Sequence, residues 1–128
     1  PAGRYKLAVQ TGGHGLFADV GLVLSAEGDD MFESNAMDYT PQQWKTAAFN
    51  GAHAADPFGS AVRITRLVGT FSDTTEKAVA VAAFVAARGA LGYAPPLRQE
   101  ISRWYASAST GRPEEIPTTE QLRRVIGV

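Results

Sequence analysis

The chain has 128 residues, which is enough for one domain with a hydrophobic core of its own. Hydrophobic residues make up 45% of it and charged residues 20%, as in ordinary globular proteins and unlike disordered ones. Twelve basic and 13 acidic side chains give a formal charge of −1, so no global electrostatic attraction to nucleic acid is expected. The absence of cysteine excludes disulfides, thiolate catalysis and cysteine-ligated zinc.

Four strands are predicted from the alternation of apolar and polar residues. They cover residues 5–10, 17–25, 31–36 (the weakest) and 60–70. The first two are joined by a glycine-rich turn at residues 12–15, where glycine allows positive φ.

A first helix is predicted between the third and fourth strands. Thr40 is expected to cap it, with Pro41 at the first helical position and Gln43 closing a capping box. The helix should end at Ala54 or Ala55. Its expected buried stripe consists of Trp44, Ala47, Ala48 and Ala52.

A second, longer helix is predicted over residues 74–91, ending before Gly92. Asp73 is expected to cap its first turn, and Glu76 to reach back to the backbone N–H of the cap. Residues 78–87 carry no charge, so this helix should be covered on more than one side.

This order of elements predicts an α+β two-layer sandwich, in which helices lie on one face of a mostly antiparallel four-stranded sheet. Residues 1–94 are expected to form that domain, and residues 95–128 a helical C-terminal extension packed on it. No apolar run approaches the length needed to cross a bilayer. A cytoplasmic location without a membrane partner is therefore expected.

Two motifs follow one another along the chain: Thr11-Gly12-Gly13-His14-Gly15 before a strand, and Asp73-Thr74-Thr75-Glu76 at a helix start. Their pairing resembles domain IV of bacterial translation elongation factor G and its ribosomal-protection relatives, which carry Ser-Gly-Gly-x-Gly and Asp-Ser-Ser-Glu there. Ala94-Pro95-Pro96-Leu97 is similar to the family's Lys-Pro-x-Leu. The resemblance covers about residues 6–101.

The resemblance implies the fold of the second domain of ribosomal protein S5, with a left-handed βαβ crossover against the general right-handed rule. It also implies a non-catalytic module whose tip loops bind ribosomal RNA of the small subunit, or a protein partner. The binding residues that it implies lie in the two tip loops: Gly12, Gly13, His14, Gly15, Thr70, Phe71 and Ser72. Arg63 and Arg66, on the predicted fourth strand, are added as candidate basic binding residues from their position alone. The family usually has arginine where His14 stands and a histidine near residues 70–72. No P-loop is present, so nucleotide hydrolysis by that route is excluded.

Other interpretations of these residues stay open. A small enzyme or small-molecule-binding protein on the same fold would use His14 with Asp73 and Glu76, although helix capping alone explains the spacing of the two acids. Basic residues of neighbouring strands would either bind phosphates or form an ordinary solvated face; they are Arg4, Lys6, Arg63 and Arg66.

No metal site or cofactor is expected, because no acidic spacing matches a calcium loop. DNA is not an expected partner. Self-association is a further possibility, through the nearly uncharged helix at residues 78–87.

Overall fold

The structure is a computed structural model that describes residues 1–11, 14–95 and 97. The expected helical extension at residues 95–128 lies outside this described part, apart from Pro95 and Leu97.

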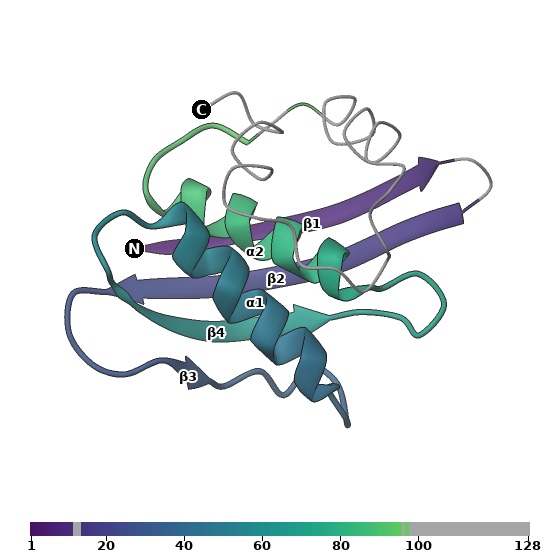
Figure 1. Ribbon diagram of the computed structural model, residues 1–128, viewed down its shortest axis with the longest axis horizontal. Helices are drawn as coiled ribbons and strands as arrows, with labels where there is room; N and C mark the ends of the chain where they lie inside the picture. Colours follow the sequence, from purple (N-terminus) through teal and green to yellow (C-terminus); the bar gives the residue numbers. More distant parts are fainter. Residues whose placement is uncertain (12–13, 96, 98–128) are drawn as a thin grey trace.

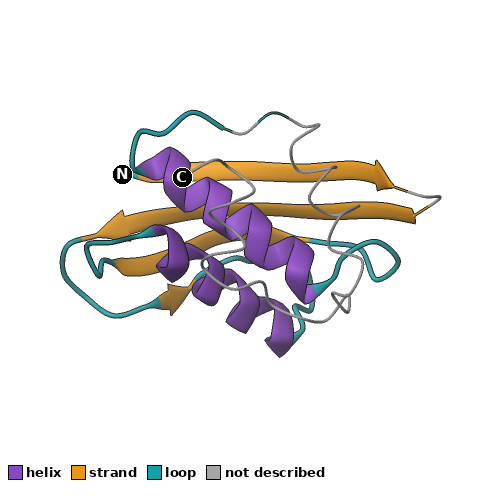
Figure 2. Ribbon diagram, turned by 45° about the horizontal axis from the view of Figure 1, so that its top comes forward, coloured by secondary structure: helices purple, strands orange, loops and turns teal. Residues whose placement is uncertain are grey.

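In the described residues, four strands and two helices follow one another in the predicted order. They are β1 (Ala2–Thr11), β2 (His14–Ser25), β3 (Met31–Phe32), α1 (Gln42–Ala55), β4 (Ala61–Val68) and α2 (Glu76–Ala90). The strands form one sheet in the order β1-β2-β4-β3, antiparallel except for the parallel pair of β3 and β4. Both helices lie on the same face of the sheet (Figures 1 and 2). The predicted α+β two-layer architecture is confirmed.

The connection between β3 and β4 runs through α1 and is left-handed. In Figure 1 both strands point to the right, α1 lies in front of the sheet, and β4 lies above β3. A right-handed crossover would place the second strand on the other side of the first. The handedness that the resemblance implied is therefore present, although strand and helix patterns alone would have favoured the opposite one.

The bounds of all four strands differ from the predicted ones, most clearly around the β1–β2 turn and in β3. β1 and β2 pair as far as Thr11 opposite His14, so His14 and Gly15 belong to a strand rather than to the turn. β3 is limited to two residues. After it, the hydroxyl oxygen of Ser34 accepts a hydrogen bond from the N–H of Leu67 (2.9 Å), so a side chain takes the place of a backbone partner.

Both predicted capping boxes are wrong in position. At α1 the cap is Pro41, whose extended ψ of 140° keeps it outside the helix, and no side chain caps the first turn. At α2 the cap is Thr75, whose side chain accepts a hydrogen bond from the N–H of Ala78 (3.1 Å). Glu76 is thus the first helical residue, and Asp73 lies in the preceding loop. The predicted stop at Gly92 is confirmed by its φ of +94° just after the last turn.

The core lies between the sheet and the two helices. Four even-numbered residues of β2 point inward and are nearly inaccessible: Ala18, Val20, Leu22 and Leu24. The two helices approach closely through small residues, since a Cβ added at Gly51 would clash with the carbonyl of Ala80. A Cβ at Gly3 would likewise clash with the carbonyl of Ala86, where β1 meets α2. Small residues therefore set the spacing of both contacts.

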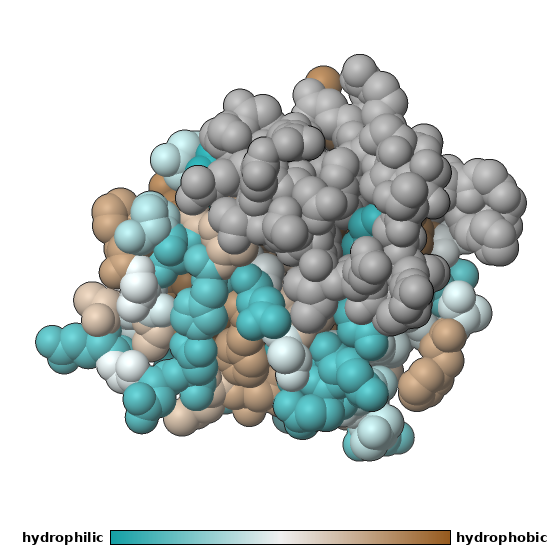
Figure 3. Space-filling model, viewed as in Figure 1, coloured by the Kyte–Doolittle hydropathy of each residue, from teal (hydrophilic) through white to brown (hydrophobic). Residues whose placement is uncertain are grey.

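Residues 77–87 of α2 are all buried, which confirms that this helix is covered on more than one side. It has no exposed apolar stripe at residues 78–87 for self-association. Where Figure 3 shows described residues on the helix-bearing surface, hydrophilic ones lie between the apolar ones that reach solvent. Within the described residues, no helix is long and apolar enough to span a membrane.

Candidate functional site

The end of the β1–β2 hairpin and the loop between β4 and α2 meet at one end of the sheet. The N–H of Phe17 donates to the carbonyl of Asp73 (3.0 Å), and the hydroxyl of Thr74 donates to the carbonyl of Phe17 (2.6 Å). The carboxylate of Asp73 lies against Gly15, where a Cβ would be 3.0 Å from Oδ2. We call this surface, formed by Gly15 and residues 69–75, the tip.

Four candidate residues of the tip therefore come together: Gly15, Thr70, Phe71 and Ser72. The backbone of His14 directly precedes Gly15 in β2. Gly12 and Gly13, the other two glycines predicted to bind, lie outside the described residues.

The loop at residues 69–75 is held by its own threonines. The N–H of Thr70 donates to the hydroxyl of Thr74 (2.8 Å), and the N–H of Thr74 donates back to the carbonyl of Thr70 (2.9 Å). The hydroxyl of Thr70 also accepts from the N–H of Asp73 (3.1 Å). At Gly69 a Cβ would be 2.6 Å from the Thr74 hydroxyl and 2.8 Å from the ring of Trp44, so glycine is needed. Bonds of this kind preorganise a loop before a ligand arrives.

Phe71 presents an aromatic ring to solvent at the tip. Its side chain is 77% exposed, while one face leans on the buried Trp44, with ring centroids 5.8 Å apart and planes inclined by 37°. An exposed ring supported in this way is suited to stacking on a nucleobase. Thr70 and Ser72, on either side, are exposed and add hydroxyl groups.

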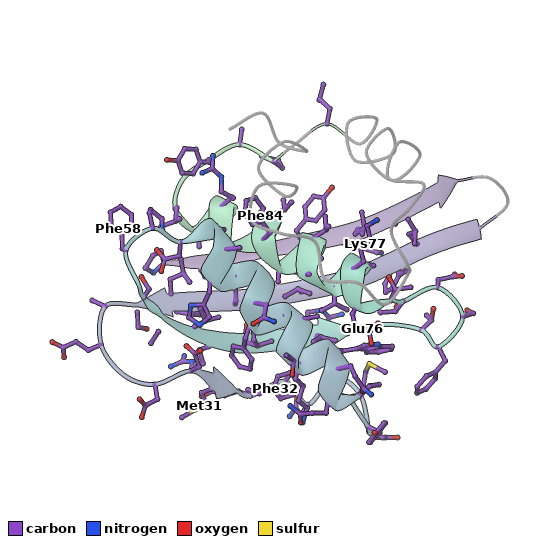
Figure 4. The ribbon with its side chains drawn as sticks, in the orientation of Figure 1. Met31, Phe32, Phe58, Glu76, Lys77 and Phe84 are labelled. Carbon is purple, nitrogen blue, oxygen red and sulfur yellow. The ribbon has the colours of Figure 1, made fainter. Side chains whose placement is uncertain are left out.

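The alternative catalytic set consists of His14, Asp73 and Glu76. Asp73 lies beside Gly15 at the tip, and Glu76 occupies the first turn of α2 (Figure 4). Across the part of the chain that the structure describes, no three His, Cys, Asp or Glu side chains are grouped as metal ligands would be.

The basic residues lie on the open face of the sheet, which we define as the face turned away from the helices. Among them, Arg66 is placed there by a bulge in β4. Gly21 pairs with Arg66 and Leu22 with Ile64, so Thr65 has no partner in the ladder. Ile64 and Leu67 consequently both face the core although they are three residues apart, and Arg66 faces outward with Arg63.

Arg66 and Arg4 share one buried carboxylate, that of Asp19, whose side chain is only 3% exposed. Arg4 donates from Nε to Oδ1 (3.0 Å) and from Nη2 to Oδ2 (2.8 Å). Arg66 donates from Nε to Oδ2 (3.0 Å). Burial by itself raises the pKa of Asp19, but the hydrogen bonds and charges of the two arginines outweigh it, and the pKa is lowered.

Asp19 was not singled out by the sequence analysis. A signal was present, because aspartate is rare in strand interiors and Asp19 alternates with apolar residues on the opposite face. An acid at such a position needs a partner on the neighbouring strands.

Arg63 lies farther from the tip than Arg66. It pairs with Val23 in the sheet ladder, and its Nε is 3.1 Å from the carboxylate of Glu33. Lys6 is exposed, pairs with Asp19 in the ladder, and places its Nζ 5.7 Å from the ring centroid of Phe17. Lys6 and Arg66 therefore lie on the two strands that flank Asp19, and Arg63 lies two ladder positions from Arg66 along β4.

A second acid, Asp30, forms a hydrogen-bonded pair with His53 at the other end of the sheet. The Nε2 of His53, in the last turn of α1, is 2.6 Å from Oδ2 of Asp30, whose Oδ1 accepts from the N–H of Val62 (2.9 Å). Partial burial raises the pKa of Asp30, but these hydrogen bonds and the charge of His53 lower it overall. This cluster joins the loop before β3 to α1 and β4.

Similarity to a solved structure supports the fold. No family model matches the chain, and no curated protein matches it. Among solved structures it is similar to the protein ttk003000868 from Thermus thermophilus, with a TM-score of 0.58 and 26% identity over 69% of this chain. That Thermus protein is elongation factor G-like, so the similarity supports an elongation factor G domain-like fold. The match spans only 15% of the length of the Thermus protein.

Proposed function

We propose that this chain is a non-catalytic module of translation-factor type that binds RNA of the small ribosomal subunit through its tip. The observation that carries the proposal is the similarity to the elongation factor G-like protein from Thermus over 69% of this chain. Because that match covers one part of a much longer protein, the proposal concerns binding by a single domain.

The geometry of the tip supports this proposal. Hydrogen bonds from Phe17 and Thr74 tie the hairpin to the loop, so that both present one surface. Phe71 supplies an exposed ring for stacking, and the flanking hydroxyls supply hydrogen bonds. A loop that is ordered before binding loses less conformational entropy when RNA arrives.

The test is cosedimentation of the chain with purified small ribosomal subunits at low and moderate salt. We expect binding that weakens as salt rises, because phosphate contacts release counterions. Phe71→Ala should weaken it about ten-fold, within the range of about 1–3 kcal/mol for one stacked base.

Phe58→Ala is the matched control. Phe58 is also highly exposed, at 79%, but lies at the opposite end of the molecule from the tip (Figure 4). The variant should bind as the unchanged protein does. Absence of binding at low salt, or equal losses for the two phenylalanine variants, would refute the proposal.

A further inference from the structure

The open face of the sheet carries a concentration of positive charge that the chain as a whole lacks. Among the residues that the structure describes, four basic ones lie there against two acids, in a protein whose formal charge is −1; they are Arg4, Lys6, Arg63 and Arg66, opposed by Asp19 and Glu33. Charge of this sign on one surface complements a polyanion.

Asp19 holds two of these cations in place. Because it accepts hydrogen bonds from Arg4 and Arg66, it draws side chains of β1 and β4 together over β2, the strand between them. Gly21 leaves room for them: a Cβ there would be 3.2 Å from the Cβ of Arg66 and 3.9 Å from the Cγ of Arg4. Both arginines are thus oriented before any ligand binds.

The guanidinium groups remain accessible in spite of these bonds. The side chain of Arg4 is 59% exposed and that of Arg66 is 41% exposed. Arg66 meets Asp19 through Nε alone, so among the described residues both of its Nη groups keep their hydrogens for a ligand. Two guanidinium groups against one carboxylate also leave a net positive charge, and guanidinium binds phosphate well.

This surface is continuous with the tip through Phe17. The backbone of Phe17 is bonded to Asp73 and Thr74 in the tip, while its ring lies beside the Nζ of Lys6 on the open face. Lys6 in turn pairs with Asp19, which lies about 13 Å along β2 from Gly15 at the usual rise per strand residue. A short segment of extended chain could therefore contact both surfaces at once.

We infer that the open face around Asp19 binds the phosphate backbone of a single RNA strand whose bases reach the tip, with Arg4, Lys6 and Arg66 as the phosphate ligands. Asp19 is a positioning residue, because it acts through the two arginines. The inference rests on the proposed function, since the tip is the part that would select RNA. Basic side chains beside an aromatic ring are the usual composition of single-strand binding surfaces.

The experiment measures binding of the whole chain to a fluorescent single-stranded RNA of about 16 nucleotides, the upper end of common site sizes, over a series of salt concentrations. Lys6→Gln and Arg66→Gln should each weaken binding about ten-fold, as expected for one lost charged hydrogen bond. Each should also make the plot of log affinity against log salt shallower by about 0.7, the value for one phosphate contact on a single strand.

Lys45→Gln is the control for loss of one positive charge. Lys45 lies on α1, in the other layer, with its Nζ 4.6 Å from the ring centroid of Phe32. The affinity and salt slope of this variant should match those of the unchanged protein. The ammonium of Lys6 lies over the ring of Phe17 and is not one of the donors to Asp19, so Lys6→Gln keeps the test informative even if Arg66→Gln disturbs folding.

The outcomes separate this inference from the proposed function. If the chain binds RNA and small subunits but Lys6→Gln and Arg66→Gln keep the original affinity and slope, only the inference fails. If it binds neither, both fail. Polyglutamate is added as a competitor at matched charge. If it displaces RNA from the unchanged chain as well as unlabelled RNA does, the surface recognises an acidic polypeptide equally, and the assignment to RNA phosphate is overturned.

Discussion

Phe17 and Asp73 are joined through their backbones, with the N–H nitrogen of Phe17 3.0 Å from the carbonyl oxygen of Asp73. This bond connects a strand near the beginning of the chain to the loop that precedes the last described helix. It makes the position of that loop depend on the sheet rather than on α2 alone. The neighbouring hydroxyl of Thr74 reinforces the connection.

Thr74→Val should loosen the tip. The hydroxyl of Thr74 donates to the carbonyl of Phe17 and accepts from the N–H of Thr70, and the residue is buried. Valine keeps the shape but leaves both partners unsatisfied, at a cost of about 1–3 kcal/mol in the free energy of unfolding, measured with urea. Ser72→Ala, an exposed change in the same loop, should stay within about 0.5 kcal/mol. Equal effects would mean that the Thr74 bonds do not contribute.

Gly51→Ala should destabilise the protein even though alanine is the better helix former. The added Cβ would clash with the carbonyl of Ala80 and force α1 away from α2, at a cost of about 1–3 kcal/mol. Gly89→Ala is the matched change in α2, where a Cβ would meet nothing within 4 Å. It should stabilise by about 0.5–1 kcal/mol. Thermal unfolding of both variants checks the opposite signs, and a stabilised Gly51→Ala would contradict the close helix contact.

Thr75→Ala should lower the free energy of unfolding by about 0.5–2 kcal/mol, because its side chain caps α2. Thr40→Ala should change it by no more than about 0.5 kcal/mol, because Thr40 does not cap α1. Urea unfolding of the two variants compares the same substitution at a real cap and at a predicted one. A larger loss at Thr40 would reverse the assignment.

The protein should become less stable in acid, because protonation of three carboxylates removes their stabilising interactions. Two of them are Asp19 and Asp30; the third, Asp56, directly follows α1 and accepts hydrogen bonds from the N–H groups of Phe58 (3.0 Å) and Ser60 (2.6 Å). Burial opposes the effect of these bonds, but the pKa values of all three carboxylates are lowered from the ordinary 3.8, so the unfolded state takes up protons first as pH falls. Their contribution is complete above about pH 4 and is lost as pH drops through the folded-state values. Asp19→Asn should therefore be less stable at neutral pH and should lose less stability on acidification. Unfolding curves at several pH values test this, and unchanged acid dependence in Asp19→Asn would contradict it.

Element order and fold class follow from the sequence because they depend on the periodicity of apolar residues, which is strong in β2 and α2. The cap of α2 was misplaced because Asp73, Thr74 and Thr75 are all good capping residues, and only tertiary bonds decide among them. Thr74 is committed to Phe17, which leaves Thr75 as the cap. The local pattern could not contain that information.

The cluster on the open face was beyond sequence reasoning for a similar reason. Arg66 faces the same side as Arg63 only because the ladder skips Thr65, and a strict alternation would have turned Arg66 toward the core. Its partner Asp19 is distant in the chain. Register and bulge together create the contact, and neither can be read from one strand alone.

The strand order has a consequence for how fast the chain can fold. β1 and β2 form a hairpin, and such pairs close within microseconds. The central pairing of β2 with β4 instead closes a long loop, because β3 and α1 lie between Ser25 and Ala61 in the chain. Closing that long loop costs conformational entropy before the stabilising contacts form. The rate-limiting step of folding should therefore be the pairing of β4 with the preformed β1–β2 hairpin.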